Sequence, residues 1–460
     1  MSRSSIVLFL ALFSLPGMAQ EKLSIRDAVD MALRNFPAIK AKQAYLQASQ
    51  AGIQTARKEA LPNFVVSLQQ DYGTVNGQNG PLYGLGGYGV ASSGLPLPEQ
   101  NWNAAFGALY LANVNWDVFT FGRNKQKVRT AGSIAERDRA DYSQEIFQHE
   151  IRVAGAYLNL VAAQRLRISQ EQNLNRADTF RNVVIRKAIN GLVAGVDSSQ
   201  ANAEFSNARS ALILARDAEQ ERANQLAFLV GIQSQDFILD TTLFSSKPDV
   251  NRQPAAATEH PTLQFYQTRI NQNEEQTKLV NAAKFPAISV FGIYQTRGSG
   301  FDFGYSADQK AYTQSYLDGV KPTRSNYLFG VGMFWNITSL TRVKQQVNSQ
   351  QYISAALQQE YNVAASQLNA QQALAANKLS NALANYQEAP IQVKAAADAY
   401  LQKSVLYHNG LATIIDVTQA LYTLNRAETT RDVATSNVWQ ALLLKAAATG
   451  DFNLFLNQLQ

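Results

Sequence analysis

Histidines, cysteines and glycine-rich motifs are the features of this sequence that could carry chemistry. The chain has three histidines, His149, His260 and His408, which lie on different segments without the spacing of metal ligands, and it has no cysteine. The segment from Gly84 to Gly89 matches the dinucleotide pattern G-x-G-x-x-G, but no predicted strand precedes it and no predicted helix follows it. The sequence therefore predicts no catalytic residue, no metal site and no cofactor.

The first 19 residues predict export from the cytoplasm. Arg3 supplies a positive charge, Ile6 to Leu15 is almost continuously apolar, and Ala19 ends a short segment suited to cleavage. After this signal peptide the chain has no run of 18 apolar residues, so any crossing of a membrane is expected through a closed barrel of strands. The net charge of +6 is scattered along helical segments, which argues against nucleic-acid binding.

The remaining sequence contains an internal repeat of two similar halves. Pro261 and Pro286 follow Pro37 and Pro62 by 224 positions. From Trp116 onward the offset is 219, and the matched pairs are Trp116 with Trp335, Arg123 with Arg342, Gly191 with Gly410, Asp197 with Asp416, and Gly231 with Gly450. A repeat of this length is a half-molecule rather than a solenoid unit. The sequence thus predicts two similar halves that differ in length between Pro62 and Trp116.

Each half contains two segments that alternate like the strands of a membrane barrel. The residues predicted to share the apolar face of a strand are Phe64, Val66, Leu68 and Tyr72; Phe106, Ala108, Tyr110, Ala112, Val114, Trp116 and Val118; Ile288, Val290, Gly292 and Tyr294; and Tyr327, Phe329, Val331, Met333, Trp335 and Ile337. A half-buried sheet in a soluble domain would also alternate. About eight strands are needed merely to fill a barrel with side chains, so four strands predict oligomerisation, and three copies would supply twelve.

Two very long helices are predicted. Residues 123–190 contain no proline and would form a helix roughly 100 Å long, with a heptad-like apolar seam from Phe147 to Ile168. The matching helix at 342–409 contains Pro390, where a kink is expected. Each long helix ends at a glycine, and the chain returns through residues 198–230 and 414–449.

Aromatic and basic residues mark the passage from strand to long helix in both halves. Trp116 and Trp335 are predicted to lie at a membrane interface. The basic residues that follow form a predicted collar, consisting of Arg123, Lys125, Lys127, Arg129, Arg342 and Lys344. We expect this collar to face anionic headgroups, whereas an ordinary solvated helix end is the alternative interpretation.

The signal peptide, the duplicated order of helix, hairpin and long helix, and the paired Gly-Leu motifs together resemble the TolC family of outer-membrane efflux proteins. The most specific motifs are Gly191-Leu192-Val193-Ala194 followed by Asp197, and Tyr407-His408-Asn409-Gly410-Leu411 followed by Asp416. The resemblance implies a membrane α+β fold with an internal two-fold repeat. It implies a homotrimer whose twelve-stranded β-barrel lies in the outer membrane and continues into a periplasmic α-helical coiled-coil barrel.

The resemblance also implies partners and a periplasmic entrance. The channel would dock to a periplasmic adaptor protein and an inner-membrane transporter, in a tripartite efflux or type I secretion system. Its entrance and docking tips would contain Gly191, Leu192, Asp197, Tyr407, Gly410, Leu411 and Asp416. In the family, the residues matching Asp197 and Tyr407 contact each other and help hold the entrance shut, but Ala412 and Gln419 replace an Arg and an Asp of the family pattern. The ordinary preferences of helix ends would also place Gly after a helix and Asp near the start of the next helix, without any role in an entrance.

These inferences divide the chain into seven segments: a signal peptide (1–19), an N-terminal helical segment (20–62), a first barrel hairpin (63–120), periplasmic helices of the first repeat with the start of the second (121–286), a second barrel hairpin (287–338), periplasmic helices of the second repeat (339–450) and a C-terminal tail (451–460). The competing interpretation is a soluble periplasmic coiled-coil scaffold. A porin-like uptake channel is a third, which the long helices disfavour.

Overall fold

The computed structural model describes residues 22–77, 94–242, 248 and 260–458. The predicted signal peptide and the segment from Gly84 to Gly89 lie outside the described residues. The chain forms two compact units, which we call the sheet unit (Ala48–Ala135 and Ile270–Ala356) and the helical unit (residues up to Gln47, Glu136–Arg269, and Leu357 onward).

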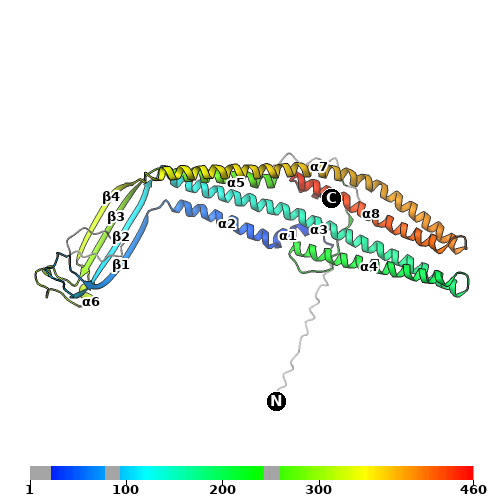
Figure 1. The fold of residues 1–460 in the computed structure, drawn as a ribbon, viewed down its shortest axis with the longest axis horizontal. Helices are drawn as coiled ribbons and strands as arrows, with labels where there is room; N and C mark the ends of the chain where they lie inside the picture. Colours follow the sequence, from blue (N-terminus) through cyan, green and yellow to red (C-terminus); the bar gives the residue numbers. More distant parts are fainter. Residues whose placement is uncertain (1–21, 78–93, 243–247, 249–259, 459–460) are drawn as a thin grey trace, which may run out of the picture. The chain divides into compact units, whose positions relative to one another are not determined.

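The two halves of the chain have the same order of main elements (Figure 1). The first contains α1 (Ile25–Asn35), α2 (Pro37–Lys58), β1 (Asn63–Thr74), β2 (Ala104–Phe119), α3 (Arg123–Ile189) and α4 (Gly195–Val230). The second contains α5 (Pro261–Ala282), β3 (Ala287–Ser299), the short α6 (Tyr316–Val320), β4 (Arg324–Phe334), α7 (Ser339–His408), α8 (Ile414–Thr449) and α9 (Asn453–Leu456). This is the order predicted from the sequence.

Some predicted boundaries move by a few residues. α2 ends at Lys58, a few residues before the predicted end of the N-terminal helical segment at residue 62. β4 ends at Phe334, so Trp335 and Ile337 follow the strand instead of belonging to it. α7 continues through Pro390 as one helix. No helix among the described residues is both long and apolar enough to cross a membrane.

The sheet unit contains one antiparallel sheet with the order β1-β2-β3-β4. The register forms rows across all four strands, such as Val66–Ala112–Tyr294–Tyr327 and Phe64–Val114–Gly292–Phe329. Residues directly opposite each other in a sheet point to the same side. Most of the apolar side chains predicted strand by strand therefore gather on one side, which we call the apolar face. The face consists of Phe64, Val66, Leu68 and Tyr72; Phe106, Ala108, Tyr110, Ala112, Val114 and Trp116; Ile288, Val290, Gly292 and Tyr294; and Tyr327, Phe329, Val331 and Met333, and the same register adds Gln70, Thr296, Gly298 and Ser325.

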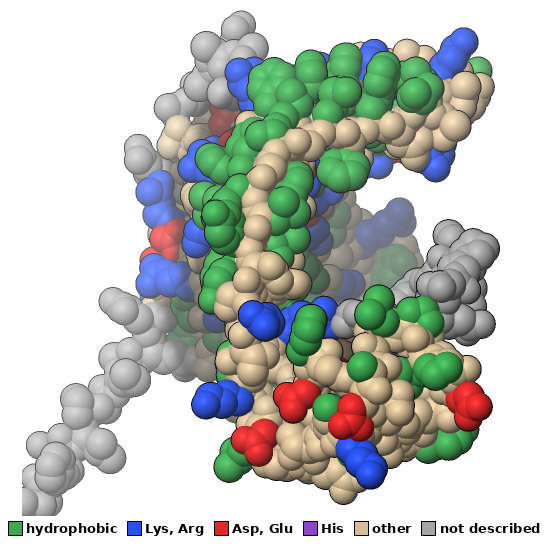
Figure 2. Space-filling model, turned by 90° about the vertical axis from the view of Figure 1, so that its left-hand side faces the viewer, with side chains coloured by type: hydrophobic (Ala, Val, Ile, Leu, Met, Phe, Trp, Pro, Cys, Tyr) green, Lys and Arg blue, Asp and Glu red, His purple; other side chains and the backbone are tan. Residues whose placement is uncertain are grey.

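The opposite side of the sheet carries most of the polar strand residues, including Ser67, Gln69, Asp71, Asn113, Asn115 and Gln295. The apolar face is largely uncovered, since Leu68, Tyr327 and Phe329 are 75%, 76% and 75% exposed. In the space-filling view, hydrophobic side chains gather side by side in the upper part of the molecule, whereas acidic side chains appear mainly in the lower part (Figure 2). The sheet unit thus exposes a large apolar surface.

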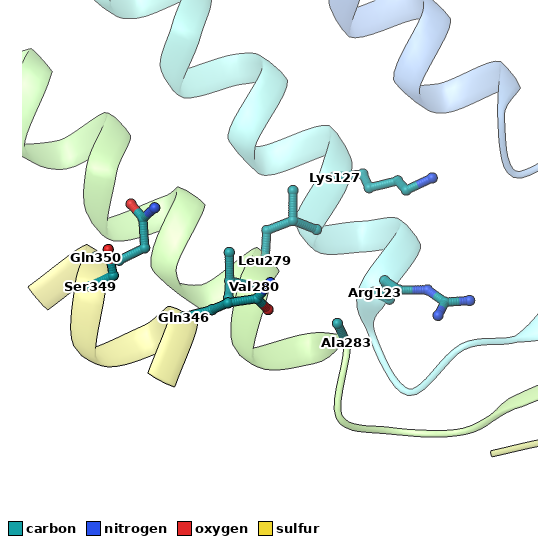
Figure 3. Close-up of a pocket in the computed structure, with 8 residues that line it drawn as sticks. All are labelled: Arg123, Lys127, Leu279, Val280, Ala283, Gln346, Ser349 and Gln350. Atoms are coloured by element: carbon teal, nitrogen blue, oxygen red, sulfur yellow. The ribbon is translucent and has the colours of Figure 1, made fainter. Parts of the chain in front are cut away.

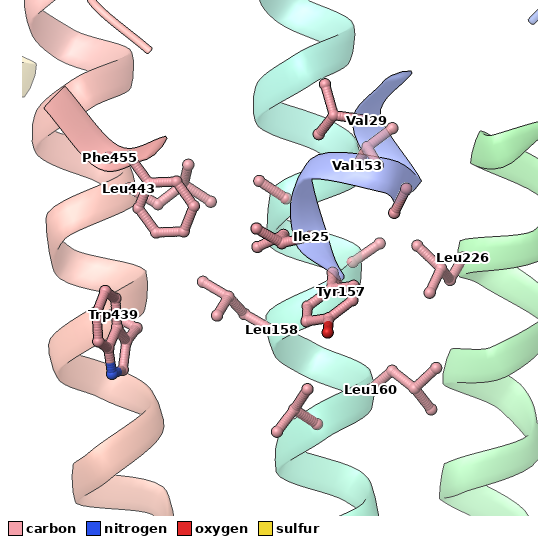
Figure 4. Packing of buried hydrophobic residues seen from close by; sticks show 14 of the residues in the cluster. Ile25, Val29, Val153, Tyr157, Leu158, Leu160, Leu226, Trp439, Leu443 and Phe455 are labelled. Atoms are coloured by element: carbon pink, nitrogen blue, oxygen red, sulfur yellow. The ribbon is translucent and has the colours of Figure 1, made fainter. Parts of the chain in front are cut away.

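The main core lies in the helical unit, where α3 packs against α1, α4 and α8 (Figure 4). Tyr157 and Leu158 on α3 and Phe455 on α9 are 0% exposed, and Trp439 on α8 is 1% exposed. The hydroxyl of Tyr157 lies 2.8 Å from the Leu23 carbonyl oxygen and 2.9 Å from that of Asp240, and it thereby connects two segments distant in sequence.

The predicted seam of α3 is only partly buried. Phe147, Ala154, Leu158 and Val161 are buried, but Ile168 is 45% exposed. Fully burying an aliphatic side chain contributes about 1.5–3 kcal/mol, so this middle part of α3 is a main source of stability.

Candidate functional site

The two helix–helix connections of the helical unit, which we call the first tip (residues 187–197) and the second tip (residues 403–416), have the same turn. At the first tip, Gly191 has φ 71° and the amide of Leu192 donates to the Lys187 carbonyl at 2.9 Å. At the second, Gly410 has φ 78° and the amide of Leu411 donates to the Leu406 carbonyl at 2.8 Å. This is the Schellman arrangement, in which glycine adopts the left-handed conformation after the helix. The paired Gly-Leu motifs predicted from the repeat therefore end α3 and α7.

The start of the return helix differs between the tips. Thr413 caps α8, because its hydroxyl accepts from the Asp416 amide at 3.3 Å while the Asp416 carboxylate accepts from the Thr413 amide at 3.0 Å. Lys403 also donates to Asp416 at 2.9 Å. The hydrogen bonds from Thr413 and then from Lys403 lower the pKa of Asp416 below its ordinary value. Asp416 is thus occupied by local capping.

The first tip lacks this capping box. Ala194 stands at the position that matches Thr413, and it has no side chain that could cap α4. Asp197 lies in the first turn of α4, where the helix dipole favours a negative charge. Its carboxylate remains partly exposed.

Tyr407, a residue of the second tip, lies in a small apolar cluster with Phe180, Val184, Ala201, Ile414 and Val417. It is 4% exposed, and its ring centre is 5.4 Å from that of Phe180. Burial and then the negative charge of Asp197 raise the pKa of Tyr407. Within the described part of the chain, its buried hydroxyl has no hydrogen-bond partner. The structure therefore brings Asp197 and Tyr407 into electrostatic range without joining them by a hydrogen bond in that part.

Lys187 is a tip residue that the sequence analysis did not single out. Its ammonium nitrogen lies 2.9 Å from the Tyr407 carbonyl oxygen and 2.9 Å from that of His408, the last residue of α7. The same nitrogen lies 4.8 Å from the centre of the Tyr407 ring. A cation at the C-terminal end of a helix interacts favourably with the helix dipole and with the unpaired carbonyls. Lys187 of α3 therefore links the first tip to the second.

Trp116 and Trp335 make the same contact in the sheet unit. The indole nitrogen of Trp116 donates to the Ala60 carbonyl at 2.9 Å, and that of Trp335 donates to the Lys284 carbonyl at 3.0 Å. Each acceptor lies two residues before the proline that precedes β1 or β3. Carbonyls just after a helix lack partners within the helix, and the indole supplies one. We call these two contacts the Trp pins.

The predicted basic collar is divided between paired and exposed residues. Arg123 lies 3.6 Å from Asp117, and Lys127 lies 2.9 Å from Glu59. The other four predicted residues, Lys125, Arg129, Arg342 and Lys344, are exposed. Arg123 and Lys127 also border a hollow of about 410 Å³ (Figure 3), together with Leu279, Val280 and Ala283 of α5 and Gln346, Ser349 and Gln350 of α7. The hollow has an apolar wall and a basic rim.

His149 and His260 pack in the helical unit and contact backbone carbonyl groups. His149 is fully buried, stacks on Phe36 at 4.0 Å and contacts the Leu229 carbonyl at 2.9 Å. His260 contacts the Ala447 carbonyl at 3.0 Å. Burial lowers the pKa of both. Among the described residues, no group of three or more His, Asp or Glu side chains is placed to hold a metal ion.

Solved structures with this fold cover 93% of the chain. They include the outer membrane protein VceC from Vibrio cholerae (16% identity, TM-score 0.71, 96% of that chain covered) and the Campylobacter jejuni CmeC outer membrane channel (15%, 0.71, 85%). They also include the open state of the Neisseria gonorrhoeae MtrE outer membrane channel (16%, 0.72, 89%). At these identities the likeness establishes the fold, which is that of an outer-membrane channel subunit. Among curated protein sequences, none matches the chain.

The sequence itself matches the outer membrane efflux protein family over residues 28–232. That match covers somewhat less than half of the chain, and the fold of the outer-membrane channels extends over 93% of it. The predicted resemblance, the predicted combination of long helices with a four-stranded antiparallel sheet, the efflux function and the outer-membrane location are thereby confirmed, whereas the trimer stays a prediction. The alternative of a soluble periplasmic scaffold is set aside. CmeC and MtrE are described as outer membrane channels.

Proposed function

We propose that this chain is one of three identical protomers of an efflux duct that crosses the outer membrane and continues into the periplasm. The observation that carries the proposal is the open-edged sheet, in which β1 and β4 have no second neighbouring strand among the described residues and one face is apolar and exposed. In lipid, unpaired strand edges leave backbone groups unsatisfied. Joining β1 of one copy to β4 of another satisfies both edges, and three copies give a barrel wide enough for a passage.

The mass of the protein in a mild detergent tests this assembly. We expect three chains per particle and electrophoretic migration that changes on heating, because closed barrels resist unfolding by detergent. A stable monomer under these conditions would contradict the proposal.

The tips are the proposed docking site for a periplasmic adaptor that connects the duct to an inner-membrane transporter. Leu192 and Leu411 support this role, because they are 70% and 74% exposed, and exposed apolar side chains grouped at one place are typical of protein contacts. Replacing both with Asp should abolish export in cells while the trimer remains in the membrane. Gln200→Asp, a change at an exposed polar position on α4, is the matched control. Normal export by the double variant would remove the tips from the docking site.

Asp197 and Tyr407 are the proposed closing residues of the entrance. Their support is the proximity of the Asp197 charge to the buried Tyr407 ring. Asp197→Ala and Tyr407→Phe should each raise single-channel conductance in planar bilayers. Since the Tyr407 hydroxyl has no hydrogen-bond partner in the described chain, the larger effect is expected from Asp197. Unchanged conductance in the double variant would assign both residues to helix packing alone.

The basic collar is the proposed contact with anionic headgroups at the inner leaflet of the outer membrane. Lys125, Arg129, Arg342 and Lys344 support it as exposed cations, and Arg123 and Lys127 add the basic rim of the hollow in Figure 3. Attraction to such a surface is worth about 1 kcal/mol per charge. Anionic lipid should raise the unfolding temperature of the wild type more than that of a variant in which Arg123, Lys125, Lys127 and Arg342 are replaced by Gln. An equal rise in both proteins would exclude the lipid contact.

A further inference from the structure

The connection between β3 and β4, residues 300–323, folds back onto the sheet. We call it the flap. Its short helix α6 lies against the apolar face: the Tyr110 hydroxyl donates to the Val320 carbonyl at 3.1 Å, and the Tyr316 hydroxyl donates to the Gln70 side chain at 2.8 Å. The rings of Phe106 and Tyr316 meet edge to face at 5.2 Å. All three strand residues belong to the apolar face, so the flap covers the same side of the sheet that carries Leu68 and Tyr327.

Two glycines allow the flap to approach the strands closely. A Cβ atom on Gly319 would lie 2.5 Å from the Phe106 carbonyl oxygen, and one on Gly298 would lie 2.7 Å from that of Lys321. Any side chain larger than hydrogen at either position would push α6 away from the sheet. Gly319 and Val320 are buried as a result. The flap is therefore a packed element of the sheet unit.

The other side of α6 leaves one large apolar side chain, Leu317, uncovered. Leu317 is 74% exposed, although its neighbours Gly319 and Val320 face the sheet. Asp318 and Lys321 are exposed polar residues next to it. An apolar side chain flanked by charged groups is typical of elements that lie at the boundary between headgroups and acyl chains.

We propose that the flap is a second membrane anchor, in which Leu317 inserts among the lipids of the outer leaflet around the duct. This inference rests on the proposed function, which puts the apolar face against lipid. The flap joins the ends of β3 and β4 remote from the long helices, since α5 precedes β3 and α7 follows β4. If those helices are periplasmic, these strand ends reach the outer leaflet. Because the flap lies on the lipid side of the sheet, lipid is the occupant that its position favours.

The absence of cysteine from the sequence makes a direct test possible. A nitroxide label is attached to a single cysteine at Leu317→Cys in the full protein, reconstituted in lipid vesicles. Collision rates with oxygen, which concentrates in lipid, and with a water-soluble nickel chelate are then measured. Two reference sites on β1 calibrate the scale: Leu68→Cys on the apolar face and Gln69→Cys on the opposite face. Heat-modifiable migration selects correctly folded protein for each variant.

We expect the ratio of oxygen to nickel collisions at position 317 to resemble that at 68 and to exceed that at 69 several-fold. A ratio like that at 69, with 68 still in lipid, would overturn the flap anchor and leave the proposed barrel intact. A label at 317 that is immobile and inaccessible to both reagents would show a contact between protomers and would also overturn the anchor. If 68 itself proves accessible to the chelate, the proposed function fails with it.

Discussion

Lys187→Met is predicted to favour the open entrance. The change keeps the length of the side chain and removes its charge, so the two hydrogen bonds to the Tyr407 and His408 carbonyls and the contact with the Tyr407 ring are lost. The apolar cluster around Tyr407 contains no part of Lys187 and should remain packed.

The size of the effect follows from these contacts. A hydrogen bond from a charged group contributes about 1.5–3 kcal/mol when it is buried. The Lys187 side chain is only partly buried, so solvent screening reduces the two bonds together to about 2 kcal/mol. At 1.4 kcal/mol per factor of ten, this loss shifts the equilibrium between joined and separated tips about 30-fold.

Single-channel recording in planar bilayers measures this shift as a larger open fraction or a higher conductance. Hydrogen exchange in residues 405–411 provides an independent measure, because these amides should exchange faster when α7 loses its link to α3. Lys403→Met is the matched control, since Lys403 contacts Asp416 within the second tip and the Thr413 capping box remains without it. Wild-type conductance and exchange in Lys187→Met, or an equal effect of Lys403→Met, would refute the assignment of Lys187 as the link between the tips.

Three further predictions concern stability. Gly410→Ala should destabilise the protein by about 1 kcal/mol, because alanine disfavours the left-handed conformation. Gly195→Ala, at a position with open space and without positive φ, should be nearly neutral in the same thermal unfolding assay. Trp335→Phe should cost about 1 kcal/mol through the lost hydrogen bond of its pin. The exposed Trp102→Phe should cost nothing measurable, and equal losses would discount the pin. Burial raises the pKa of Glu150 from 4.5 to about 7, so the folded protein retains a proton that the unfolded chain releases. Stability should therefore fall as the pH rises between these two values, and Glu150→Gln should flatten this slope in unfolding curves. An unchanged slope would show that Glu150 does not cause it.

Much of the fold could be predicted from local patterns. The face of most strand residues followed from the two-residue period of the backbone. The prediction for Val118 was wrong, because the register shifts between Asp117 and Phe119 and Phe119 lies opposite Ile288. The ends of α3 and α7 followed from Gly191 and Gly410, because only glycine adopts positive φ without cost. The predicted length difference between the halves corresponds to the longer connection at 75–103 compared with 300–323.

Other features depend on contacts that no local pattern encodes. The link from Lys187 to α7 could not be predicted, because its acceptors are backbone carbonyls on a helix 220 residues away. The docking of the flap likewise depends on contacts between the connection of β3 to β4 and strand residues far away in sequence, such as Gln70 and Tyr110. For the tips, the sequence supplied the residues through the family resemblance, and the structure added that Asp416 is engaged in capping whereas Ala194 leaves Asp197 without an equivalent cap.

The Trp pins allow the acceptor residues in the two halves of the chain to differ in sequence. Each pin joins an indole to a main-chain oxygen, and the acceptor residues are a small apolar Ala60 in one half and a long basic Lys284 in the other. A codon change at either acceptor leaves the oxygen in place, because every amino acid has a backbone carbonyl. The hydrogen bond at the joint between helix and strand therefore requires the tryptophan, whereas the acceptor residue can change without loss of that bond. Two halves that share few identical residues retain the same joint for this reason.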